Sequence, residues 1–236
     1  MEWMKLERKK TNFKTYIRSA AAIFAGILAM EILFLFLPKI DHPAQVGEEL
    51  FTEWNGISML ISVLHFAGFG ILAAVISAKL VIGEYSQKNA AVILCYPIKR
   101  NKILNAKCAV ICAFTTLSVF LCNTVTIFLG CIIAKIGKLE LTGSIANLIL
   151  TVPCISFFTG VISSCAGILS AAIGQKKHSA TAAVVASFLI SCVLAQCFSI
   201  SYTHILAVTA AVCAVMIFAA ILGYWILKKE IERLEV

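Results

Sequence analysis

Six long apolar stretches, separated by short polar segments, dominate this sequence of 236 residues. A helix needs about 20 consecutive apolar residues to cross the hydrocarbon core of a bilayer, which is about 30 Å thick. The stretches of this length cover residues 19–37, 56–82, 108–134, 145–173, 180–200 and 205–227. The sequence therefore predicts an all-α polytopic membrane protein, with six transmembrane helices in a single domain over residues 1–236.

The composition excludes the soluble alternatives. Hydrophobic residues make up 61% of the chain and charged residues 14%, whereas soluble domains are typically about 45–50% apolar and about 25% charged. Disorder requires low hydrophobicity and high charge, and a water-soluble fold of this composition would expose large apolar patches. Neither a disordered chain nor a typical soluble enzyme fits these values.

Most basic residues lie on one side of the predicted spans. Segments 1–18, 83–107, 174–179 and 228–236, together with Lys79, hold 17 of the 20 lysines and arginines. Because cytoplasmic loops are enriched in basic residues, both termini are expected in the cytoplasm. Membrane topology thereby accounts for the net charge of +8, and no nucleic-acid partner is expected.

The first 18 residues combine basic side chains with apolar ones. Trp3, Leu6, Phe13 and Ile17 recur near helical spacing, with lysines and arginines between them. This pattern is typical of an amphipathic helix that lies on the membrane surface. We expect an interfacial helix over residues 1–18; the alternative is a basic tail that only sets topology.

Sequence motifs that would indicate catalysis are absent. The chain contains no H-E-x-x-H, G-x-S-x-G or G-x-x-x-x-G-K-[ST] pattern, the signatures of zinc peptidases, serine hydrolases and nucleotide-binding loops. Its ten cysteines show no C-x-x-C spacing and are interpreted as reduced, buried side chains rather than metal ligands. We therefore expect that the chain is not an enzyme and carries no catalytic residue, metal or cofactor.

Three polar residues inside the spans are candidates for a translocation path: Glu31, His65 and Asn123. Glu31 is the only acidic residue within a predicted span, and it either lines a path or extends outward to meet Lys39. His65 and Asn123, like Gln196, have a second interpretation as hydrogen-bonding residues between helices.

The polar segment 83–107 is longer than the other polar segments between spans on its side of the membrane. It begins with the acidic Glu84, continues through a short apolar run at 90–96, and reaches Pro97, which ends any helix there. A basic cluster follows. We expect a short coupling helix along the cytoplasmic face, followed by a turn; the alternative is an ordinary amphipathic loop anchored by its apolar residues.

This segment resembles the cytoplasmic loop of ABC-2 type transporter permeases, whose pattern is E-x-x-x-G-T-x-x-x-L-L-x-x-P-[VI]-x-R-x-x-[IL]-x-x-x-K. The matching residues are Glu84, Ile93, Leu94, Pro97, Ile98, Arg100, Ile103 and Lys107. The chain departs from the pattern at the Gly-Thr pair, where Lys88 and Asn89 stand. The six spans and the basic N-terminal segment also resemble small permeases of bacterial systems that export lantibiotics, bacteriocins or phenol-soluble modulins.

The resemblance implies a permease subunit of an ATP-binding cassette transporter in a bacterial plasma membrane. Two permeases, as a homodimer or with a sister permease, would form the pathway, and a separate pair of cytoplasmic ATPases would bind ATP and Mg²⁺. The implied ATPase-coupling residues are Glu84, Tyr85, Gln87, Lys88, Ile93, Leu94, Pro97 and Arg100.

The apolar character of the spans favours some classes of cargo over others. Their interiors are apolar and nearly free of fixed charge, and a charged cargo would normally meet counter-charges. This favours export of an amphipathic or hydrophobic peptide, with a drug or a lipid as the alternative. A six-span scaffold or sensor without transport activity is the alternative from another functional class.

Overall fold

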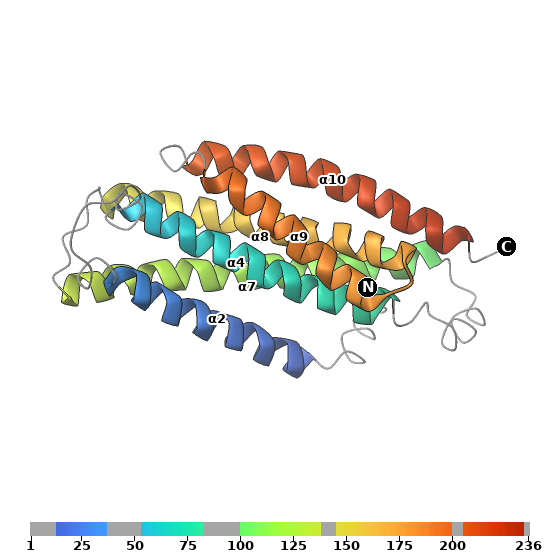
Figure 1. Ribbon diagram of the computed structural model, residues 1–236, viewed down its shortest axis with the longest axis horizontal. Helices are drawn as coiled ribbons and strands as arrows, with labels where there is room; N and C mark the ends of the chain where they lie inside the picture. The colour runs from blue at the N-terminus through green and yellow to red at the C-terminus, as the bar shows by residue number, and fades with distance from the viewer. Residues whose placement is uncertain (1–12, 37–52, 83–99, 138–144, 200–204, 234–236) are drawn as a thin grey trace.

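The computed structural model describes residues 13–36, 53–82, 100–137, 145–199 and 205–233 (Figure 1). These residues form the α-helices α2 (Phe13–Phe36), α4 (Trp54–Ser77), α7 (Arg100–Ile136), α8 (Ile145–Lys176), α9 (Ala180–Ser199) and α10 (Ile205–Arg233), and the short π-helix η2 (Ala78–Ile82). Within the described residues, six helices are long and apolar enough to cross a membrane. The prediction of an all-helical, six-span membrane protein is confirmed.

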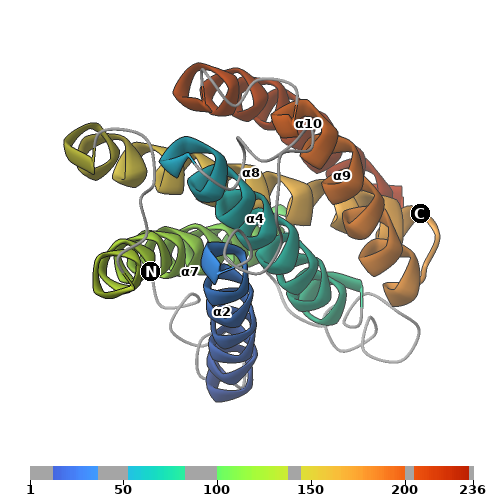
Figure 2. The ribbon, with the colours of Figure 1, turned by 60° about the vertical axis from the view of Figure 1, so that its left-hand side comes forward.

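Helices α4 and α8 form the centre of the bundle. In the most apolar 18-residue stretch of each of these two helices, 61% of the residues are buried, whereas the corresponding share is 22% in α2 and 28% in α10. Helix α8 packs against α4, α7, α9 and α10, whereas α2 packs against α4 and α7. Figure 2 accordingly shows α2 and α10 on opposite sides of α4.

Two helices begin within segments that the sequence assigned to surface structure. Helix α2 begins at Phe13 and runs unbroken to Phe36, so residues 13–18 continue directly into the first span. Helix α7 begins at Arg100, so residues 100–107 are the first two turns of the third span. The rest of the expected interfacial helix, at 1–12, and of the coupling segment, at 83–99, lies outside the described residues.

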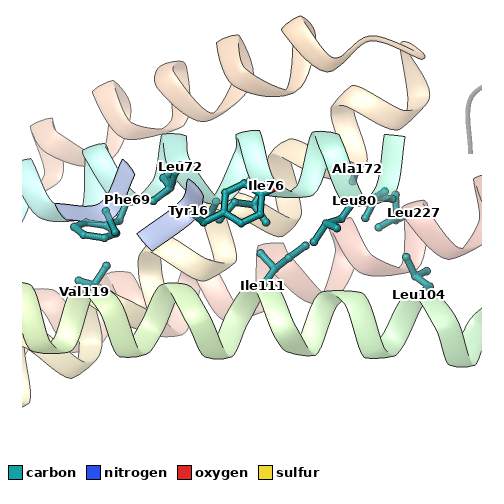
Figure 3. Packing of buried hydrophobic residues seen from close by; sticks show 13 residues of the cluster. Tyr16, Phe69, Leu72, Ile76, Leu80, Leu104, Ile111, Val119, Ala172 and Leu227 are labelled. Atoms are coloured by element: carbon teal, nitrogen blue, oxygen red, sulfur yellow. The ribbon is translucent and has the colours of Figure 1, made fainter. Parts of the chain in front are cut away.

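One end of the bundle brings together the start of α2, the end of α4 with η2, the start of α7 and the end of α10 (Figure 1). We call this the η2 end. A cluster of buried apolar side chains from these elements and α8 joins them (Figure 3). Its labelled members are Tyr16, Phe69, Leu72, Ile76, Leu80, Leu104, Ile111, Val119, Ala172 and Leu227. Apolar packing thus fixes the helices on both sides of segment 83–99 relative to each other.

Candidate functional site

A polar junction joins the three inner helices α4, α7 and α8. The side-chain amide of Asn123 on α7 donates to Ser62 Oγ on α4 at 3.2 Å and to Ser156 Oγ on α8 at 3.0 Å. All three side chains are at most 1% exposed. Because both amide hydrogens have partners, Asn123 lies in an apolar bundle without losing its hydrogen bonds. We call these three residues the Asn123 junction.

His65 lies one turn after Ser62 on α4, and it faces Thr126, which lies one turn after Asn123 on α7. Its Nδ1 is 2.9 Å from the carbonyl oxygen of Ile61, and since a carbonyl only accepts, Nδ1 carries the hydrogen. In the neutral ring Nε2 is then an acceptor, and it lies 3.4 Å from Thr126 Oγ1, whose hydroxyl also reaches the carbonyl of Cys122 at 2.8 Å. The imidazole is completely buried and stacks on Phe69. His65 therefore joins α4 to α7, as the sequence suggested.

A second group of hydroxyls lies where α4, α8 and α9 approach closely. The oxygens of Ser163, Ser187 and Ser191 surround Gly70, and a Cβ atom at this glycine would lie 3.7–3.8 Å from each of them. Ser163 Oγ donates to the carbonyl of Phe66 at 3.4 Å. Ser187 Oγ is buried without a hydrogen-bond partner among the described residues. With the Asn123 junction and His65, these hydroxyls form a line of uncharged polar groups through the bundle, which we call the polar seam.

Glu31 meets α7 at a different level from His65 and Asn123. The carboxylate is 1% exposed and fits against Gly130, where an added Cβ atom would collide with it. Asn123, Thr126 and Gly130 are spaced three and four residues apart, so they lie on one face of α7. The structure therefore places all three sequence candidates along this face, but only His65 and Asn123 belong to the polar seam.

The carboxylate of Glu31 is poorly satisfied. Its Oε2 atom is buried without a hydrogen-bond partner in the part of the chain that the structure describes. The buried side chains around this part of α2 are apolar, and include Ile27, Leu35 and Ile127. An acid in such surroundings is costly, and this cost argues against a purely structural role.

Of the predicted coupling residues, seven lie outside the described residues: Glu84, Tyr85, Gln87, Lys88, Ile93, Leu94 and Pro97. Arg100 is the first residue of α7. The last residue of the matching pattern, Lys107, is 1% exposed, and its Nζ donates to the carbonyl oxygen of Leu80 at 2.8 Å. This hydrogen bond joins the end of η2 to the start of α7, the two helices that flank segment 83–99.

Sequence reasoning missed two features of the site. The partners of Asn123 and His65, which are Ser62, Ser156 and Thr126, were not identified. Serine and threonine are common in membrane helices, and their spacing alone does not show which helices they join. Lys107 was recognised as part of a pattern, but its burial was not foreseen. Gln196, for which an interhelical hydrogen bond was suggested, is exposed on α9.

Comparison with known proteins was consistent with this architecture. A family model described as "ABC-2 family transporter protein" matches residues 1–193. A protein of Bacillus subtilis (strain 168) named "Uncharacterized protein YcbO" is 31% identical over 123 residues, which cover 52% of each chain. The chain therefore matches about half the length of this relative. No solved structure gives a significant match.

Proposed function

Because this chain belongs to the ABC-2 family of transporter proteins, and is thus a membrane subunit of an ABC transporter, we propose that it exports amphipathic or hydrophobic peptides. A separate pair of cytoplasmic ATPases drives the export. A second copy of the chain, or a sister permease, completes the pathway. ATP and Mg²⁺ are bound on the ATPase subunits, since the sequence contains no P-loop pattern.

The observation that carries the proposed cargo class is the uncharged character of the polar seam. Among the described residues between the levels of Lys107 and Gly130, the buried polar groups on α7 and on the helices facing it are hydroxyls, an amide and an imidazole. Such groups can exchange hydrogen bonds with peptide amides and hydroxyls during helix movements. They offer no fixed charge to an ionic solute, so they support an amphipathic cargo over an ion.

Energy is proposed to enter at segment 84–100, as the family pattern implies. Support comes from the two helices that flank this segment, α4 with η2 and α7. The apolar cluster and the hydrogen bond of Lys107 fix these helices to each other. A displacement of the segment by the ATPases would therefore act on α4 and α7 together.

Co-purification tests the partner. The tagged chain, extracted from membranes of its native host, is expected to retain a cytoplasmic protein that carries a P-loop. Recovery of active, stable protein without any nucleotide-binding partner would instead support the scaffold or sensor alternative.

Transport assays test the cargo and the coupling segment. Proteoliposomes that contain the complex are supplied with ATP and with a labelled amphipathic helical peptide, a labelled phospholipid or a hydrophobic dye. We expect ATP-dependent movement of the peptide, and loss of that movement in Glu84→Lys and Arg100→Glu. Lys135→Glu, at the opposite end of α7, is the matched control. Normal transport in both coupling variants would contradict the proposed docking segment, and movement of only lipid or dye would contradict the peptide cargo.

A further inference from the structure

The π-helix η2 lies between α4 and the proposed coupling segment. It follows α4 without a break, at Ala78–Ile82, and ends directly before the segment that is proposed to receive the ATPases. A π-helix has i→i+5 hydrogen bonding, is rare in proteins and is frequently found at functional sites. Its geometry is wider than that of the α-helix, so η2 is a place where α4 departs from regular helical packing.

One buried lysine connects η2 to the next span. Lys107, in the second turn of α7, is 1% exposed, and its Nζ donates to the carbonyl of Leu80 at 2.8 Å. A buried ammonium group requires hydrogen-bond acceptors, so the side chain is held at this carbonyl. The contact ties together residues that are 27 positions apart in sequence and lie on either side of segment 83–99.

The surroundings of η2 extend this connection to the rest of the bundle. Leu80 and Val81 belong to the apolar cluster that includes Leu104 on α7 and Leu227 on α10 (Figure 3). The ammonium group of Lys79 lies 5.9 Å from the centre of the Tyr16 ring on α2, and η2 also packs against α8 and α9. Side chains of η2 therefore contact, or share the apolar cluster with, side chains of every spanning helix.

We propose that Lys107 is a positioning residue for energy coupling, which ties the start of α7 to the π-helix so that α4 and α7 respond as one unit to the ATPases. This inference rests on the proposed function. The lysine acts through the carbonyl of Leu80, and it touches neither cargo nor nucleotide. Without it, α7 would still be displaced, but a smaller part of the displacement would reach η2 and the end of α4, which would then be coupled to α7 by apolar packing alone.

Hydrogen–deuterium exchange of the reconstituted complex tests this proposal. Exchange is measured with and without ATP plus vanadate in wild type, in Lys107→Met and in Lys135→Met. The methionine side chain has nearly the volume of lysine but no donor, and Lys135 is an exposed lysine near the other end of α7. In wild type and Lys135→Met, nucleotide is expected to change exchange both in residues 100–110 and in residues 74–82.

In Lys107→Met the nucleotide-dependent change is expected to persist in 100–110 and to fall at least threefold in 74–82. The amount of cargo moved per ATP hydrolysed is expected to fall with it. A general loss of stability would not separate the two segments in this way. An unchanged response of 74–82 in Lys107→Met would overturn the proposal.

The wild-type complex provides a second test that depends on no variant. As nucleotide occupancy is increased, the exchange of 74–82 and of 100–110 is expected to change in parallel. A response confined to one of these segments would overturn the role of Lys107 even if Lys107→Met failed to fold. If nucleotide changed exchange in no helix of the wild-type complex, the proposed function itself would fail.

Discussion

Two buried ionisable side chains lie near opposite ends of the third span, Lys107 on α7 itself and Glu31 on the neighbouring α2, and their environments differ. Lys107 donates to a backbone carbonyl of the π-helix at 2.8 Å. Glu31 lies against the bare backbone of Gly130, with Oε2 unpartnered among the described residues. The two contacts on α7 are 23 residues apart, or about 35 Å at 1.5 Å per residue, which is close to the thickness of the bilayer core.

The difference indicates which end of the bundle is fixed and which can change. At the η2 end a charge is satisfied, and five spans are joined by apolar packing. At the Glu31 end a polar group lacks a partner, and it belongs to α2, the least buried span of the bundle. We expect the first contact to stabilise the bundle and the second to cost free energy, which is consistent with a helix that moves during transport.

The largest expected effect comes from filling the space that Glu31 occupies. Gly130→Ala places a methyl group where the carboxyl group of Glu31 lies, so the end of the Glu31 side chain must move into apolar surroundings or α2 must shift away from α7. Overpacking of this kind typically costs about 1–3 kcal/mol, and we expect a decrease near 3 kcal/mol in the free energy of unfolding in detergent. The measurement is unfolding monitored by helical circular dichroism.

Two controls make this prediction specific. Gly26→Ala lies on α2, where an added Cβ meets nothing within 4 Å, so it should not lower the unfolding free energy and should raise it by up to about 1 kcal/mol through helix propensity. Adding Glu31→Ala to Gly130→Ala should restore most of the lost stability. If the double variant is no more stable than the single one, the collision is not the cause.

The next effect concerns the satisfied charge. Lys107→Met removes the donor and leaves the Leu80 carbonyl without that hydrogen bond. A buried polar group that loses its partner costs about 1–3 kcal/mol, and we expect a decrease of about 2 kcal/mol in unfolding free energy. Lys135→Met should show no decrease. Equal stabilities for the two variants would show that the Lys107 contact contributes nothing to the fold.

The Asn123 junction should contribute less. Hydrogen bonds between membrane helices contribute about 0.6–2 kcal/mol each, because the separated helices also find partners. We expect Asn123→Leu to lower the unfolding free energy by about 1.5 kcal/mol, whereas Gln196→Leu, on the exposed face of α9, should have no effect. A loss as large as that of Gly130→Ala would mean that the junction, rather than helix packing, dominates the core.

The smallest effect, and the one of opposite sign, is expected for Glu31→Met. This change removes an unpartnered carboxyl group from an apolar contact, so the unfolding free energy should stay the same or rise by about 1 kcal/mol. Transport of the peptide should nevertheless fall if Glu31 serves the moving helix. A loss of stability similar to that of Lys107→Met would show that Glu31 has a stabilising partner, and would remove the contrast between the two ends.

The sequence by itself determined the class, the number of spans and the family. Length and hydropathy are sufficient for these, because a bilayer requires each spanning segment to satisfy its own backbone hydrogen bonds as a helix. The pattern through Pro97, Arg100 and Lys107 pointed to the family because the spacing of a local motif is visible in the chain itself. The candidate residues Glu31, His65 and Asn123 were also found this way, since polar residues are conspicuous in apolar stretches.

Only the tertiary structure decided how these residues are used. Helix periodicity shows which side chains share a face, but not which face of another helix meets it. The pairing of Asn123 with Ser62 and Ser156, the fit of Glu31 against Gly130, and the reach of Lys107 to Leu80 all join residues at least 27 positions apart. Such contacts depend on how six apolar helices pack together, which the hydropathy of each helix does not specify.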